Sequence, residues 1–230
     1  MKRFYECAEA RAAADGHEIL LDGKPVRTPG RAPLIVPTPA LAEAIAGEWN
    51  VQGETIDARA MVCTGLANAA IDRVAPDPPA FAARLASYGE SDLLCYRAGA
   101  PAALAARQEA EWSPLLDWAR HRFDVDFEVT AGIIHRCQPA NTVVRLRRAV
   151  EARGAFELAA LSPLVTISGS LVVALALAER AIDLEAAWRA ASVDDAWQAE
   201  KWGEDPEAAR ALEARQREFG AAHRFLDLLR

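Results

Sequence analysis

The chain has 230 residues and a formal net charge of −7, with 52% hydrophobic and 26% charged residues. These proportions are ordinary for a globular protein and exclude a largely disordered chain. Because an acidic chain repels phosphate backbones and anionic lipid surfaces, we expect neither a nucleic acid nor a membrane surface as its partner.

The N-terminal third has the short apolar runs and turn-forming residues that are typical of β-structure. Ile19 and Leu21 have the two-residue spacing of one strand face, the dipeptide Asp22-Gly23 favours a tight hairpin turn, and Val26 continues the pattern after it. Residues 34–36 form a further short apolar run between prolines. Since five prolines lie between positions 25 and 39, we expect these strands to be short or at a sheet edge.

Helices follow, and several are predicted to begin with proline at the first helical position behind a capping side chain. These starts are Thr38-Pro39, Asp77-Pro78, Ser162-Pro163 and Asp205-Pro206. The first of these helices should present Leu41, Ile45 and Trp49 on one face. Residues 101–123 form a long helical pattern that Pro114 divides or kinks. Ser192 and Asp195 have the spacing of a capping box, and Gly203 should end that helix.

The apolar stretch 164–178 is predicted to be one buried helix, because its 15 residues fall short of the ~20 that span a bilayer. We therefore expect no membrane insertion. Residues 127–134 interrupt the helical pattern with alternating apolar side chains, and we interpret them as a strand that returns to the N-terminal sheet.

Together these elements predict an α+β fold. We expect a small N-terminal domain, residues 1–75, that contains an antiparallel sheet and is packed on a larger, mainly helical C-terminal domain, residues 76–230. The sequence contains no internal repeat, and no low-complexity linker separates the two predicted domains.

The cysteines and the opening residues bear on the compartment. The four cysteines lie far apart and never in a C-x-x-C arrangement, so we expect no structural zinc, no other metal and no redox dithiol. Cys95 lies in an apolar run in which burial would raise the thiol pKa and leave it inert. The chain opens without a secretory signal, so we expect a cytoplasmic protein with reduced thiols.

A search for catalytic motifs finds none. There is no Walker loop, no G-x-G-x-x-G and no H-E-x-x-H, and the four histidines stand alone at large separations. We therefore expect no cofactor and no enzymatic activity. Because catalytic groups can converge from distant positions, an enzyme with a composite small-molecule site between the two domains stays open as the alternative.

An acidic segment near the C-terminus is the most unusual feature of the sequence. Between Val193 and Ala209, Trp197 and Trp202 are interleaved with six carboxylates: Asp194, Asp195, Glu200, Glu204, Asp205 and Glu207. These carboxylates either favour helix starts, with both tryptophans in the core, or form an acidic, aromatic surface for a basic or amphipathic partner. The residues alone leave both interpretations open.

Here the sequence resembles a known family, the assembly chaperones of the F1-ATPase α subunit. Trp197-Gln198 with Lys201-Trp202-Gly203 resembles the family's W-Q…K-W-G block. Further similarity runs through nearly the whole chain, in Arg3-Phe4-Tyr5, Leu21 to Pro29, Leu41 to Gln52, Leu66 to Asp72, and Asp92 to Arg97. Met61-Val62 and Thr64-Gly65-Leu66 depart from the family pattern.

The resemblance implies a protein that binds the free α subunit of F1-ATPase, prevents its aggregation and hands it to the β subunit during ATP synthase assembly. It places the sensitive acidic position at Asp194 or Asp195, with Gln198, Trp202 and Glu207 as supporting partner-binding surface. The oligomeric state is left open, with a monomer as the expectation. A constitutive structural subunit of the ATP synthase is a further alternative.

Overall fold

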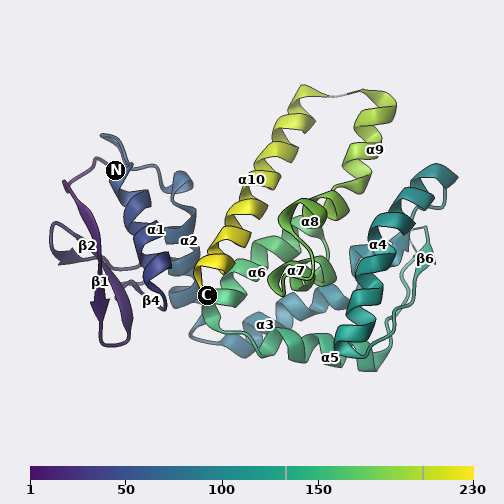
Figure 1. Cartoon of the computed structure of the whole chain (residues 1–230), viewed down its shortest axis with the longest axis horizontal. Coiled ribbons are helices and arrows are strands. Elements are labelled where there is room, and N and C mark those ends of the chain that lie inside the picture. The colour runs from purple at the N-terminus through teal and green to yellow at the C-terminus, as the bar shows by residue number, and fades with distance from the viewer. Residues whose placement is uncertain (133, 204) are drawn as a thin grey trace. The chain divides into compact units, whose positions relative to one another are not determined.

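The computed structural model describes residues 1–132, 134–203 and 205–230. It has the α+β fold that the sequence predicts, with antiparallel strands near the N-terminus and helices through most of the remainder (Figure 1). Two compact units are present. The first comprises Met1–Pro78 with Gly154–Ala160 and Arg224–Arg230, and the second comprises Pro79–Arg153 and Leu161–His223. The expected division after residue 75 stays a prediction.

The first unit is organised around strand β2, which pairs antiparallel with all three other strands of its sheet. Asp22 (φ 48°) and Gly23 (φ 76°) both adopt positive φ, as a type I′ turn requires, and so connect β2 to β3. Helix α1 packs against β1, β2 and β4. The strands are β1 (Ala8–Ala13), β2 (Gly16–Leu21), β3 (Lys24–Pro25) and β4 (Ile35–Val36), and α1 is Pro39–Asn50.

Helix α1 begins as predicted, with Thr38 as its cap and Pro39 in the first turn. Leu41 and Ile45 are fully buried, whereas Trp49 is only partly buried and packs on a smaller cluster. The unit continues with the 3₁₀ turn Ala58–Ala60, α2 (Val62–Ala69) and a π-helical turn, Ala70–Val74.

The second unit is built around helix α7, whose eight residues are all buried. Helix α7 packs against α4 and α8, and α4 also packs against α9. The helices that contribute to this unit are α3 (Pro78–Ala86), α4 (Ala102–Phe123), α5 (Ala140–Glu151), α6 (Ala155–Ser168), α7 (Leu171–Ala178), α8 (Leu184–Ala191), α9 (Val193–Trp202) and α10 (Pro206–Leu228). The 3₁₀ turns Ser87–Glu90 and Leu93–Cys95 complete its helical content within the described residues.

The predicted apolar helix 164–178 is wrong in detail, because the structure contains two helices there. Gly169 has a φ of +68°, which ends α6, and the Ser170 hydroxyl accepts the Val173 N–H at 3.0 Å to begin α7. Pro163 lies inside α6 instead of opening a helix. Pro114 likewise lies inside α4, which runs unbroken from Ala102 to Phe123.

Two further expectations are corrected. Among the described residues of the segment 127–134, only Thr130–Ala131 form a strand, β6, and it pairs parallel with β5 (Tyr96–Arg97) of the same unit and not with the N-terminal sheet. The Gly132 N–H also donates to the Arg97 carbonyl at 2.8 Å, so this segment forms its backbone hydrogen bonds with β5. Residue 133 of that segment lies outside the described residues. Ser192 makes no side-chain cap on α9, because its hydroxyl donates to the Trp188 carbonyl at 2.7 Å.

Candidate functional site

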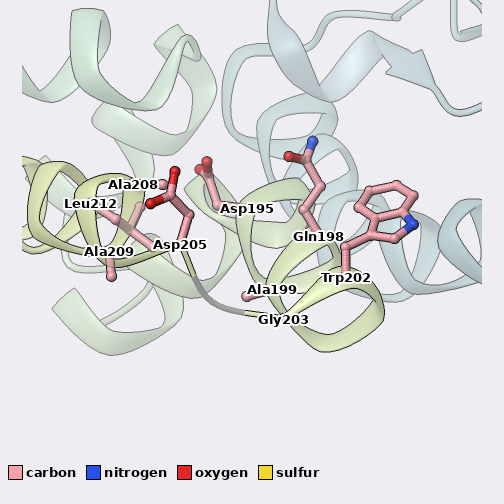
Figure 2. A pocket seen from close by; sticks show the side chains of 9 residues that line it. All are labelled: Asp195, Gln198, Ala199, Trp202, Gly203, Asp205, Ala208, Ala209 and Leu212. Carbon is pink, nitrogen blue, oxygen red and sulfur yellow. The ribbon is translucent and has the colours of Figure 1, made fainter.

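The end of α9 and the beginning of α10 enclose a hollow of about 320 Å³ (Figure 2). Gly203, with a φ of +85°, ends α9 as predicted, and Asp205 precedes Pro206 at the start of α10. The two helices run in opposite directions (Figure 1). Small and apolar side chains line the hollow together with two carboxylates, in the set Asp195, Gln198, Ala199, Trp202, Gly203, Asp205, Ala208, Ala209 and Leu212.

The neighbouring carboxylates Asp194 and Asp195 have different environments. Asp194 accepts a hydrogen bond of 2.7 Å from the side-chain amide of Gln108 on α4. Gln108 is only 3% exposed, and its other amide atom accepts the Ala98 N–H at 2.6 Å. Asp194 therefore completes the hydrogen bonding of a buried amide and ties α9 to α4.

Asp195 lines the hollow, and its carboxylate lies 3.4 Å from the guanidinium of Arg215 on α10. The same guanidinium donates to the carbonyl of Ile167 at 3.1 Å. Both side chains of the ion pair are 42% exposed, so water screens the pair and its contribution to stability is small. Both side chains of the acidic pair are partly buried, but Asp195 is the one that lines the hollow.

The two tryptophans of the segment divide between core and surface. Trp197 is buried, and the Lys201 ammonium lies 4.8 Å from the centre of its ring. Trp202 is 78% exposed and lies on the same helix as Asp195 and Gln198, at the rim of the hollow (Figure 2). An indole exposed to this extent is uncommon away from binding surfaces, because aromatic side chains are enriched at interface cores.

The remaining carboxylates of the segment are placed as follows. Glu200 is paired with Arg107 at 2.7 Å, and Asp205 accepts the N–H of Glu207 at 3.0 Å, as a cap at the start of α10. The Glu207 side chain is exposed and does not line the hollow. Glu204 lies outside the described residues. The structure therefore brings Asp195, Gln198 and Trp202 to one hollow, and sets Asp194 and Glu207 apart from it.

Sequence reasoning did not identify several of the residues that shape this site. Leu212 belongs to the apolar face of the last helix and shows no local sign of a site, and Ala199, Ala208 and Ala209 give no signal by themselves. Arg215 was not identified as the partner of Asp195, nor Gln108 as the partner of Asp194. A signal for this part of the site is present in the first two turns of α10. There the helical spacing of Ala208, Ala209 and Leu212 indicates an apolar stripe beside the acidic segment.

The arrangement suits the binding of a basic, partly apolar protein segment. The alanines and Leu212 offer an apolar floor, Asp195 and Asp205 offer negative charge at the rim, and Trp202 offers a ring face to a cation. In the part of the chain that the structure describes, no group of three or more His, Cys, Asp or Glu side chains is placed to hold a metal ion. None of the helices described is both long and apolar enough to cross a membrane.

Comparison with known proteins identifies relatives of the whole chain. The model of the ATP12 chaperone protein family matches residues 2–120. The crystal structure of Atp12 from Paracoccus denitrificans is 41% identical, with a TM-score of 0.94, and the match covers 100% of this chain and 98% of that one. An aspartate-to-lysine mutant of the same Paracoccus protein matches equally well. A protein of Agrobacterium tumefaciens, named as a candidate chaperone, is 40% identical over 100% of this chain and 86% of that one, with a TM-score of 0.95.

The fold and these relatives define a chaperone of the α+β class. The chain belongs to the ATP12 chaperone family, which confirms the resemblance that the sequence motifs indicate.

Proposed function

We propose that this chain is an ATP synthase assembly chaperone that binds the free α subunit of F1-ATPase, prevents its aggregation and hands it to the β subunit. Family membership supports the general role. The observation that carries the choice of site is the acid-rimmed hollow at α9 and α10, with Trp202 exposed at its edge. The proposed location is the bacterial cytoplasm, where F1 subunits would first meet the chaperone.

Such a chaperone must bind the α subunit tightly but reversibly. Carboxylates at the rim would steer and orient a basic segment of the α subunit, while the apolar floor and the indole would supply contact area. A dissociation constant on the order of micromolar, equivalent to about −8 kcal/mol, would prevent aggregation and still allow the β subunit to displace the chaperone.

The test is co-expression of the tagged chain with its cognate α subunit in the absence of β, with the amount of soluble α as the readout. We expect soluble α in complex with the chain, and release of α when β is added. Asp195→Lys and Trp202→Ala should each reduce the retained α at least tenfold, because both side chains lie at the rim of the hollow. Glu218→Lys, which makes the same charge change on an exposed face of α10, serves as the matched control.

The comparison of Asp194 with Asp195 separates binding from folding. Asp195→Lys should change the free energy of unfolding by less than about 0.5 kcal/mol, since its ion pair is exposed. Asp194→Ala should lower it by about 1–3 kcal/mol, because the buried Gln108 amide loses its acceptor. Equal retention of α by Asp195→Lys, Trp202→Ala and Glu218→Lys would remove this hollow from the proposal.

A further inference from the structure

A second hollow, of about 470 Å³, lies in the N-terminal unit beside the β2–β3 turn and the end of α1. Its volume lies within the range of ordinary binding pockets, roughly 300–1,000 Å³. Its lining is largely apolar and aromatic, with Phe4 and Tyr5 from the N-terminal segment, Leu21 and Val26 from the hairpin, and Trp49 from α1. The function proposed above makes no use of it.

The aromatic wall of this hollow is fixed by hydrogen bonds on both sides of Phe4. The Arg3 guanidinium donates to the Gln52 carbonyl at 2.6 Å, and the Tyr5 hydroxyl donates to the Trp49 carbonyl at 2.6 Å. The Tyr5 ring meets the rings of Phe4 and Trp49 edge-on, each with centroids 5.5 Å apart. The side chain of Phe4 is nevertheless 65% exposed. The residues on both sides of it are therefore held by hydrogen bonds while its ring stays in contact with water.

In the same wall, the side chain of Trp49 has an unsatisfied hydrogen-bond donor. Its indole N–H is buried and has no acceptor within the described residues. A buried donor without a partner is unfavourable, and such groups are rare in folded proteins. The lining of this hollow therefore includes an exposed phenylalanine and a tryptophan whose buried indole N–H has no acceptor within the described residues.

The rim of this hollow carries net positive charge, in contrast to the chain as a whole. The exposed side chain of Lys24 makes no hydrogen bond or ion pair with the residues that the structure describes, and the Arg27 guanidinium donates only to the Arg31 carbonyl, at 2.8 Å. Asp22 also lines the hollow, but backbone N–H groups occupy its carboxylate, that of Cys7 at 2.9 Å and that of Glu6 at 3.1 Å. The free charges at the rim are those of Lys24 and Arg27.

We infer that this hollow is a second docking site, and that it receives a segment of the α subunit in which a large apolar side chain stands beside carboxylates. The inference rests on the proposed function for the identity of the partner. Its chemistry is complementary to that of the hollow at α9 and α10: one site takes an acidic segment and the other a basic one. Two sites of opposite charge fix which part of the partner each one meets, because the reversed arrangement would place like charges together.

The test is competition for the α subunit by variants of the second site. A complex of labelled wild-type chain with co-expressed α is challenged with unlabelled competitor, and the half-displacing concentration is measured. The site variants are Lys24→Glu with Arg27→Glu, and, separately, Phe4→Ala. The control is Arg59→Glu with Arg73→Glu, which makes the same charge change at two exposed positions of the same unit. We expect about a tenfold higher half-displacing concentration for each site variant, and less than twofold for the control.

An array of peptides that tile the α-subunit sequence supplies the second readout. Wild type should bind acidic peptides that contain a large apolar residue, and the Lys24→Glu, Arg27→Glu double variant should not. Half-displacing concentrations equal to wild type in folded site variants would overturn the second site alone. A wild-type chain that retains no α during co-expression would overturn the proposed function and this assignment of the partner with it. Sedimentation as a dimer that the site variants convert to a monomer, with unchanged competition for α, would instead assign the hollow to self-association.

Discussion

Cys63 and Cys95 are buried, whereas Cys7 and Cys137 are exposed. Burial raises the pKa of the Cys63 thiol and of the Cys95 thiol to about 12. The carboxylate of Glu48 adds to the shift at Cys63, and that of Asp92 adds to the shift at Cys95. Both thiols are therefore neutral and inert in the folded chain at neutral pH, as the sequence context of Cys95 indicates.

A thiol titration tests this division. With a disulfide reagent at pH 8, two thiols should react at once, and the other two only after unfolding in guanidinium chloride. A native protein in which three or four thiols react rapidly would contradict the burial of this pair.

The same shifts predict how stability depends on pH. Because the folded-state pKa lies above the ordinary value of 9.0, the buried neutral thiols favour the folded state fully below pH 9. The free energy of unfolding should then fall between about pH 9 and pH 12, by up to about 1.4 kcal/mol per pH unit for each thiol. Denaturation in urea across this range measures the slope, and replacement of Cys63 by serine should remove part of it.

At the same scale, the acidic pair shows where prediction from the sequence stops. The carboxylates were recognised as unusual, and Asp195 and Trp202 do lie at one hollow. Their separate roles depend on Gln108, 86 positions from Asp194, and on Arg215, 20 positions from Asp195. No local pattern carries that information, since it arises from the packing of α4 against α9 and from an ion pair between α9 and α10.

Among the elements, α7 depends on one buried carboxylate. Asp92 is fully buried, and it accepts the N–H of Val172 at 3.0 Å and that of Leu94 at 3.1 Å. Burial raises the pKa of this carboxyl, while the hydrogen bonds it accepts oppose the rise. Asp92 therefore joins the first turn of α7 to the 3₁₀ turn that precedes β5.

Asp92→Ala should lower the free energy of unfolding by about 2–4 kcal/mol, because two buried N–H groups lose their acceptor. Asp183→Ala is the matched control: Asp183 caps α8 through the Ala186 N–H at 2.8 Å but is exposed. That control should lower the free energy by about 1 kcal/mol. Equal losses in urea denaturation would show that burial of the cap has no effect.

Element boundaries were predictable where one residue fixes them. Thr38-Pro39, Asp205-Pro206 and Gly203 mark helix ends as the sequence indicates. The helix start predicted at Pro163 is wrong, because Pro163 lies in the interior of α6. Proline there removes one backbone hydrogen bond, and the helix continues through it. The dipeptide Gly169-Ser170 marks the break between α6 and α7, because a glycine with positive φ is followed by a capping serine. The apolar residues on both sides of it make the stretch resemble one continuous helix.

At the scale of the whole molecule, the net charge of −7 conceals local differences in sign. The hollow at α9 and α10 has an acidic rim, whereas the rim at Lys24 and Arg27 is basic. The total charge led to the expectation of no nucleic-acid or membrane partner, but it could not show either patch, because the residues of each come together only in the folded chain.

The charged rims predict a salt-dependent association with the α subunit. The rate of complex formation, after α is diluted from urea into the chaperone, should fall at least about fivefold between 20 and 300 mM NaCl, because screening shortens the range of attraction. Asp195→Lys should show a smaller dependence than wild type, and Glu218→Lys should match wild type. A rate independent of salt in all three would argue against steering by these charges.

Arg215 has a consequence for release. Its guanidinium lies 3.4 Å from the Asp195 carboxylate and also donates to the Ile167 carbonyl at 3.1 Å. A basic side chain that reached Asp195 would therefore take part in a ligand exchange, in which one cation replaces another at the same carboxylate. The net electrostatic gain of such an exchange is small and its reversal is fast, since the displaced guanidinium stays tethered nearby. If the α subunit binds at α9 and α10 as proposed, an intramolecular competitor of this kind would make that binding reversible.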